Sequence, residues 1–140
     1  MKTFKFALVA FLFTTTFGTF AQTGTGKVYL IRSTGFAGSA VNYWFYIDGT
    51  LTCKTKNKLF SIHDLSAGEH TVSIVAGGLR TAKKSPPVKI TVVAGKTNYV
   101  SVVSTERGYS NKIACQEITE NSAQPLLAKA KEKKDCLASK

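Results

Sequence analysis

Residues 41–49 read VNYWFYIDG, and this stretch constrains the fold more than any other part of the chain. Five bulky residues of high β-propensity stand in a row. The Asp48-Gly49 pair that follows them is the strongest short-range signal for a tight turn. The stretch therefore predicts a central β-strand that ends in a turn.

The side chains of this strand are expected to alternate between two faces. The predicted core face is formed by Val41, Tyr43, Phe45 and Ile47. The other face carries Asn42, Trp44, Tyr46 and Asp48. Trp44 and Tyr46, with Asn42 at their edge, could form an exposed platform for a ligand such as a sugar. A C-terminal helix could instead cover the rings, and we favour this interpretation because a helix must bury its apolar patch.

The remaining apolar runs predict further short strands, at residues 27–32, 59–65, 69–76, 88–94, 97–103 and 112–118. Residues 50–58 are polar and alternating, which is typical of an exposed hairpin or edge strand. The two runs on either side of Gly95-Lys96 are expected to pair as a hairpin. About seven or eight strands separated by turn signals indicate an all-β fold, an immunoglobulin-like or transthyretin-like antiparallel β-sandwich.

The C-terminal residues 119–140 are rich in Ala, Leu, Lys and Glu, and they predict one short surface helix with a Lys-rich tail. Asn121 or Ser122 can cap this helix, and Pro125 is tolerated only in its first turn. Lysines toward the C-terminal end suit the helix dipole. The apolar patch of the helix consists of Leu126, Leu127 and Ala130.

Residues 1–21 are typical of a secretory signal peptide. Lys2 and Lys5 precede the apolar run FALVAFLF, and a small-x-small pattern closes the segment. The run is broken before it reaches the roughly 20 apolar residues of a membrane-spanning helix. The expected organisation is a signal peptide (1–21), a β-sandwich domain (22–118), and the helix with its tail (119–140). We expect an exported protein of the periplasm or cell surface of a Gram-negative bacterium, with no transmembrane segment after cleavage.

The chain is strongly basic, with 19 Lys and Arg against eight Asp and Glu and a net charge of +11. Lys2 and Lys5 are the only charged residues of the leader, so the rest of the chain carries +9. An exported basic protein meets anionic lipid or polysaccharide first. Aromatic residues do not interleave with the charges as nucleic-acid stacking requires, so no nucleic-acid binding is expected. Lys54, Lys56 and Lys58 are candidates for an anion contact, although their simpler role is to protect an edge strand.

The three cysteines, Cys53, Cys115 and Cys136, allow three alternative disulfides, each with one thiol left over. Cys115 lies in an apolar strand pattern and can be a buried small hydrophobe. Cys53 and Cys136 have polar neighbours and are the better candidates for an exposed disulfide pair or for free thiols. No Cys-x-x-Cys spacing supports zinc binding or thioredoxin-type chemistry.

Signals for catalysis are weak throughout the sequence. The acids stand singly, no Gly-x-Ser-x-Gly motif occurs, and the two histidines, His63 and His70, do not have ligand spacing. A pairing of Cys53 with His63 has only composition in its favour. We therefore expect neither an enzyme nor a bound metal or cofactor.

The order of motifs over residues 27–130 resembles that of known domains. The strand FYIDG, a polar hairpin and LSAGEHTVSIVAGG resemble PEGA-type domains. The longer succession KVYLIR, VNYWFYIDG, LSAGEHTVSI and AGKTNYVSV, followed by a strand and a short helix, is similar to a domain-of-unknown-function family of small bacterial envelope proteins. The resemblance implies an exported or envelope-attached β-sandwich without an established activity. It also implies structural roles in turns for the motif residues Asp48, Gly49, Gly68, Glu69 and His70.

These observations predict a non-enzymatic exported envelope protein that acts as a binding or structural module, with another envelope protein as its partner. The alternative is a glycan- or lipid-binding accessory protein that uses its basic surface and exposed aromatic residues.

Overall fold

The structure is a computed structural model that describes residues 23–35, 39–77, 83–107 and 110–136. The predicted signal peptide, residues 1–21, lies outside the described residues. Within the described ranges, no helix has both the length and the apolar character needed to cross a membrane.

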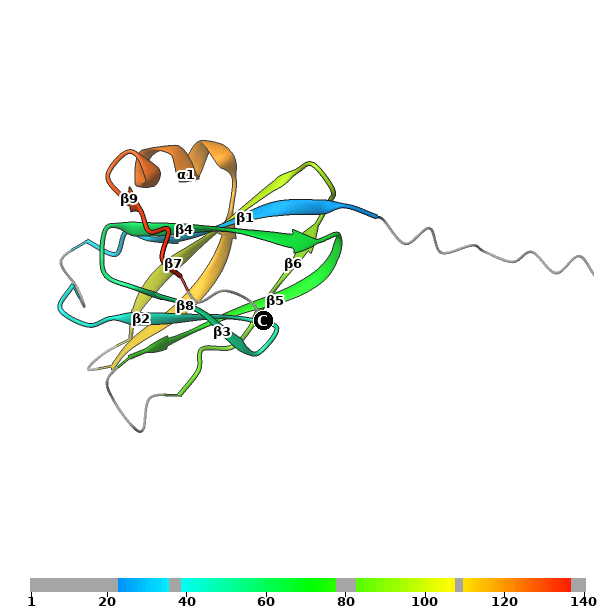
Figure 1. The fold of residues 1–140 in the computed structure, drawn as a ribbon. Coiled ribbons are helices and arrows are strands. Elements are labelled where there is room, and N and C mark those ends of the chain that lie inside the picture. The colour runs from blue at the N-terminus through cyan, green and yellow to red at the C-terminus, as the bar shows by residue number, and fades with distance from the viewer. Residues whose placement is uncertain (1–22, 36–38, 78–82, 108–109, 137–140) are drawn as a thin grey trace, which may run out of the picture.

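The described residues form nine strands and one helix. In chain order they are β1 (Thr25–Arg32), β2 (Tyr43–Ile47), β3 (Thr50–Thr55), β4 (Leu59–Ser66), β5 (Gly68–Ala76), β6 (Val88–Val92), β7 (Thr97–Arg107), β8 (Ser110–Ile118), α1 (Glu120–Leu127) and β9 (Lys131–Glu132). The strands form two sheets that pack face to face (Figure 1). The predicted all-β sandwich with a short C-terminal helix is confirmed.

The larger sheet has the strand order β8-β7-β1-β4-β9, and the smaller has the order β3-β2-β5-β6. Most neighbouring strands are antiparallel, as predicted, but β1 pairs with β7 in parallel and β4 pairs with β9 in parallel. Side-chain alternation reports which face a residue occupies, and it carries no information on the direction of the neighbouring strand. Because its two neighbours are β7 and β4, β1 lies at the centre of the larger sheet, although it is the first strand of the chain.

The core lies between the two sheets and is built from alternating strand residues. Its buried members are Val28, Leu30, Tyr43, Phe45, Ile47, Val72, Ile74, Ile90, Val92, Val100, Val102 and Cys115. The predicted core face of β2 is confirmed for Tyr43, Phe45 and Ile47. Val41 is an exception, because it precedes the strand and is 36% exposed. Full burial of a side chain such as Phe45 contributes roughly 1.5–3 kcal/mol, so this layer supplies much of the stability.

Residues 88–103 do not form the predicted hairpin. β6 pairs with β5 in the smaller sheet, whereas β7 pairs with β1 and β8 in the larger one. The intervening turn crosses from one sheet to the other, where Gly95 adopts a φ of 72° and donates its N–H to the Thr25 carbonyl at 3.0 Å. Two strands show the same alternation whether they pair side by side or face each other across a core. The pattern alone could not separate these arrangements.

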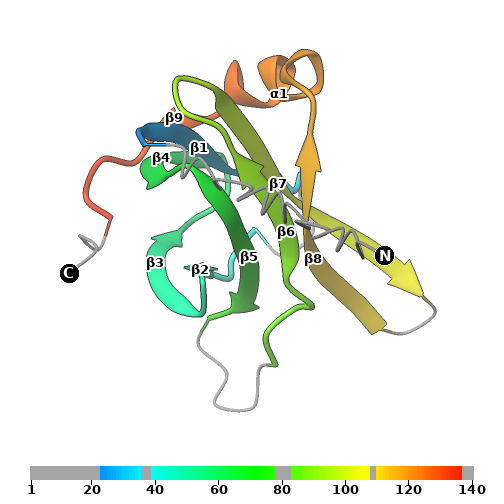
Figure 2. The ribbon, with the colours of Figure 1, turned by 90° about the vertical axis from the view of Figure 1, so that its right-hand side faces the viewer.

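Helix α1 covers the outer side of the larger sheet, so the prediction that it covers Trp44 and Tyr46 on the smaller sheet is wrong (Figure 1). α1 packs against β7, and its Ala123 is fully buried. Figure 2 shows the same arrangement from the side, with α1 far from β2 and β3. The reason is the short connection, because β8 ends at Ile118 in the larger sheet and the helix begins two residues later.

The start of α1 also differs from the prediction. Thr119 is the N-cap, and its Oγ1 accepts the N–H of Ser122 at 3.4 Å. Asn121 and Ser122, the predicted caps, lie inside the helix. The earlier start places Pro125 beyond the first turn of an eight-residue helix. The helix ends at Leu127, so no lysine lies in its last turn.

The Lys-rich segment after α1 returns to the sandwich as an ordered strand. Lys131 donates its N–H to the Lys58 carbonyl at 3.0 Å, and Lys133 donates to the Phe60 carbonyl at 2.7 Å. These bonds place β9 at the edge of the larger sheet beside β4. The described part of 119–140 is therefore integrated into the sandwich.

Candidate functional site

Trp44 and Tyr46 lie on the outer face of the smaller sheet, away from α1. Both rings are half-buried, and Trp44 stands opposite Lys54 of β3 and Val75 of β5. The two aromatic residues are separated by one position on β2, which places their Cα atoms about 7 Å apart on one face of the strand. The helix therefore does not cover these rings, which stay partly accessible on the outer face of the smaller sheet.

An ammonium group lies over each of the two rings. Lys54 Nζ is 4.6 Å from the centre of the Trp44 ring, and Lys84 Nζ is 3.9 Å from the centre of the Tyr46 ring. Lys84 Nζ also donates a hydrogen bond to the Gly49 carbonyl at 3.4 Å. Cation–π attraction thus holds two positive charges at defined places on the sheet. We call Trp44, Tyr46, Lys54 and Lys84 the aromatic–lysine face.

The backbone of Gly77 fixes the position of the Trp44 indole. A Cβ atom on Gly77 would clash with the indole nitrogen, so only glycine allows this close approach. The Gly77 N–H donates to the Asn42 carbonyl at 2.6 Å and holds the end of β5 against the residue that precedes β2. Asn42, predicted as a platform residue, thus has a backbone role beside the indole.

The three lysines predicted as an anion contact do not form one row. Lys54 lies over Trp44, whereas Lys56 and Lys58 follow the end of β3 and are exposed. Lys58 has a φ of 58° in the turn toward β4, which removes it from the alternation of the strand. Sequence reasoning missed Lys84, which stands 38 positions after Tyr46. The only sequence feature that pointed to Lys84 was the basic run that precedes Pro86 and Pro87.

A groove of about 930 Å³ opens at the edge of the sandwich where β3 and β4 face each other. Its lining includes apolar residues and both signs of charge, among them Ile47, Leu65, His63, Asp64, Glu132 and Lys133.

The disulfide between Cys53 and Cys136 lies at this edge and joins β3 to the segment after β9. The pair favoured by the sequence is thus the one that is joined. Cys53 is fully buried, so the polar, exposed surroundings predicted for it are wrong.

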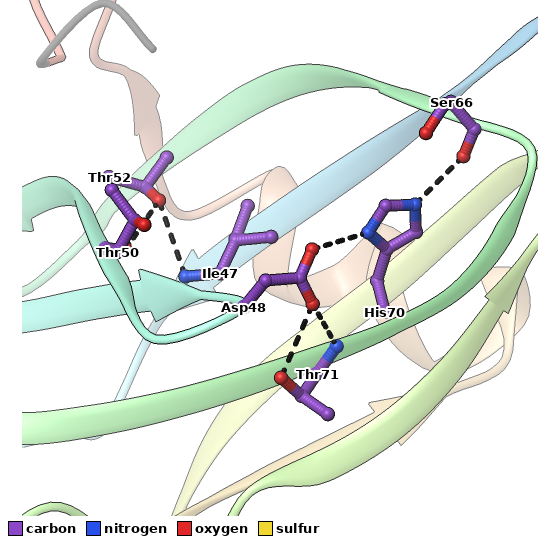
Figure 3. A network of polar contacts seen from close by, with 7 residues as sticks. All are labelled: Ile47, Asp48, Thr50, Thr52, Ser66, His70 and Thr71. Atoms are coloured by element: carbon purple, nitrogen blue, oxygen red, sulfur yellow. Dashed lines mark hydrogen bonds and ion pairs between the residues drawn. The ribbon is translucent and has the colours of Figure 1, made fainter. Parts of the chain in front are cut away.

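The motif residues Asp48 and His70 belong to a polar network that pins the β2–β3 turn to β5 (Figure 3). His70 Nδ1 lies 2.6 Å from Asp48 Oδ2, and His70 Nε2 lies 2.8 Å from the Ser66 carbonyl oxygen. Asp48 Oδ1 accepts the N–H of Thr71 at 2.8 Å. Both partners of the imidazole are acceptors, so only the protonated ring satisfies both of them.

The pKa shifts in this network follow from its hydrogen bonds. The bond to Asp48 raises the pKa of His70, against the opposing effect of burial. Burial acts to raise the pKa of Asp48, but the hydrogen bonds from His70 and Thr71 outweigh it and lower that pKa. Both shifts favour the pair of protonated His70 and ionised Asp48, and the network links the β2–β3 turn to β5.

The other histidine, His63, lies on β4 between the core and the groove. Its Nε2 is 2.9 Å from the hydroxyl oxygen of Ser61, which is only 1% exposed. Burial lowers the pKa of His63 and favours the neutral imidazole. His63 therefore lies beside the disulfide, with one ring nitrogen within 4.8 Å of the sulfur atoms of Cys53 and Cys136.

Comparison of the chain with known protein families, with curated proteins and with solved structures finds no match. The resemblance to PEGA-type domains stays a prediction. The functional interpretation rests on the geometry of the described residues.

Proposed function

We propose that this protein is an exported, non-enzymatic binding module that holds an acidic polysaccharide on its aromatic–lysine face. One observation carries the proposal: two aromatic rings lie side by side on a sheet face, each with a lysine ammonium over it. The Cys53–Cys136 disulfide supports export, because disulfides persist in oxidising compartments.

The aromatic–lysine face suits a sugar that carries a carboxylate or sulfate group. A charge-assisted hydrogen bond to such a group draws the ammonium aside and opens the ring to the C–H face of the sugar. Lys54 and Lys84 are already held near their working positions, so less side-chain freedom is lost on binding. The positive charge of the whole chain adds long-range attraction for a polyanion.

A polysaccharide fits this face better than the interior of a lipid bilayer does. Among the residues that the structure describes, Val41 is the only large hydrophobic side chain that is exposed. Proteins that insert into the membrane interface present several apolar side chains on one face. The half-buried rings of Trp44 and Tyr46 suit contact with a ligand that lies on the sheet.

The arrangements around both histidines support binding in place of catalysis. In a nucleophilic triad the imidazole faces a hydroxyl or thiol, but His70 Nε2 faces the Ser66 carbonyl oxygen, which cannot act as a nucleophile. His63 does face a hydroxyl, but Ser61 is buried and out of reach of a substrate.

The fluorescence of Trp44, the single tryptophan of the chain, gives a direct test. The protein is titrated with polygalacturonate as an acidic polysaccharide and with dextran as a neutral one, each at low and high salt. We expect polygalacturonate to change the Trp44 emission in a saturable way, with weaker binding at high salt. Dextran is expected to leave the emission unchanged.

A matched pair of variants separates a site from general charge attraction. Lys84→Gln removes a charge from the aromatic–lysine face, whereas Lys129→Gln removes an exposed charge from the turn between α1 and β9. Lys84→Gln is expected to weaken binding about fivefold, which corresponds to roughly 1 kcal/mol for an exposed charge. Equal effects of the two variants, or no binding at all, would refute the site. Binding to phosphatidylglycerol vesicles but not to polygalacturonate would assign the face to a lipid surface.

A further inference from the structure

The groove edge brings together three metal-ligating side chains from three separate segments. Cys53 comes from β3, His63 from β4, and Cys136 from the segment after β9. One donor atom from each residue lies within 4.8 Å of the other two. This cluster lies at the edge of the sandwich and is independent of the aromatic–lysine face on which the proposed function rests.

The donor set and its spacing suit a closed-shell thiophilic cation. Zinc binds thiolate sulfur at about 2.3 Å and imidazole nitrogen at about 2.0–2.1 Å, almost always in tetrahedral geometry. Ligand atoms around such an ion therefore stand roughly 3.5–3.8 Å apart. The distance between the His63 nitrogen and the sulfur atoms would have to shorten by about 1 Å for all three to bind one ion. The two sulfur atoms, which are bonded to each other in the disulfide, would have to move apart.

The disulfide and a metal ion compete for the same sulfur atoms. A dithiol reductant can transfer two electrons and two protons to the Cys53–Cys136 bond, which becomes two thiols while the dithiol becomes a disulfide. Both thiols then lose a proton as they bind the cation. We propose that reduction converts this pair, with His63, into a Cys₂His site that binds one Zn²⁺ ion and leaves the fourth position open to the groove.

The groove beside the cluster has no excess of acidic groups. Its three carboxylates, those of Asp48, Asp64 and Glu132, face Lys133 and Lys134, and Asp48 and Asp64 already pair with His70 and Lys27. The contact between His63 and Ser61 holds the imidazole in place, in the manner of the outer partners that orient metal-bound histidines.

The test compares the oxidised and the reduced protein. The full protein is reduced with a phosphine under argon and freed of metal. It is then titrated with Co²⁺, which reports thiolate coordination through a charge-transfer band, and Zn²⁺ is added last. We expect the band to saturate at one Co²⁺ per reduced chain, to disappear on addition of Zn²⁺ and to be missing from the oxidised protein.

The variants use the remaining cysteine and histidine as matched controls. His63→Gln keeps both cysteines, so it can fold with its disulfide closed before reduction. It is expected to weaken Zn²⁺ binding by more than about 100-fold, because even substitutions of residues that only contact a metal ligand cost about 10–100-fold. Cys136→Ser should abolish the band, while Cys115→Ser and His70→Gln should keep it. Lack of a saturable band in the reduced protein, an unchanged affinity in His63→Gln, or loss of the band in Cys115→Ser would overturn the proposal.

Discussion

Asp48 and His70 stand 22 residues apart in the sequence, and a 2.6 Å contact between Oδ2 and Nδ1 joins them in the fold. The side chain of His70 is 13% exposed and that of Asp48 is 51% exposed, so the pair lies at the surface with its imidazole side turned inward. It fastens the turn after β2 to β5 and so sets one wall of the groove.

The first prediction concerns the pH dependence of this pair. The raised pKa of His70 gives a stabilisation that is complete below its unfolded value of about 6.5 and is lost as pH rises through the folded pKa. The lowered pKa of Asp48 gives a second stabilisation, which is complete above about pH 3.9 and is lost as pH falls through the folded pKa of Asp48. We expect His70→Gln to lower the free energy of unfolding by on the order of 1 kcal/mol near pH 5.5, and by less near pH 9.

Urea unfolding of both proteins at the two pH values measures this effect. Asp48→Asn serves as the partner variant, and adding His70→Gln to it should cost little more, because the two residues act as a pair. A larger effect of His70→Gln at the higher pH would mean that the native imidazole is neutral.

The second prediction concerns the contact between Gly77 and Trp44. Gly77→Ala places a Cβ atom against the indole ring, which must shift. We expect a loss of about 1–3 kcal/mol in unfolding free energy, as for other overpacked sites, and a change in the Trp44 emission. Thermal unfolding followed by fluorescence measures both. In a Trp44→Ala background, where circular dichroism replaces fluorescence, most of the cost of Gly77→Ala should vanish.

The third prediction concerns the disulfide as a source of stability. Cys53 and Cys136 close a loop with a sequence separation of 83, so reduction restores much conformational freedom to the unfolded chain. The chain-entropy relation gives about 4.5 kcal/mol for such a loop, and measured values commonly fall at about 2–4 kcal/mol. Urea unfolding in metal-free buffer, with and without reductant, tests this. Identical midpoints would show that the bond adds no stability.

The fourth prediction concerns Cys115, the free cysteine of the core. Burial raises its pKa to about 12, so the thiolate that reacts with alkylating and disulfide reagents is scarce in the native protein. We expect a thiol assay at about pH 8 to find no reactive thiol in the native oxidised protein and one after unfolding in urea. Rapid labelling of the folded protein would mean that β8 opens readily at this position.

On β2, the alternation of residues was enough to predict which face lies inside, because Tyr43, Phe45 and Ile47 are buried. On β5 it was not enough: Ser73 and Val75, expected on the exposed face, are buried together with Val72 and Ile74. The same signal could not identify neighbouring strands, which is why β6 and β7 were predicted to pair. Neighbours are set by connections and by packing between distant segments, and a local pattern contains neither.

The candidate site shows the same limit. Trp44 and Tyr46 were singled out from one strand, and Lys54 lay close enough in sequence to be considered. Lys84 reaches Tyr46 only because residues 83–87 return beside β5, where the Ser85 N–H donates to the Ile74 carbonyl at 2.8 Å. The location of α1 was predicted wrongly for a similar reason. Both sheets carry aromatic rings on their outer faces, and the sequence does not show which face the helix covers. On the larger sheet Tyr29 stacks with Phe60 and contacts Tyr99.

The central place of β1 bears on the order in which the chain assembles. Residues 27–31 need residues 97–101 as their parallel neighbours, so the larger sheet cannot close until most of the polypeptide is present. Contacts between such distant segments are slow to form, because the intervening chain must first lose its freedom. A chain that still lacks residues 97–101 therefore has no parallel partner for β1 and cannot complete the larger sheet.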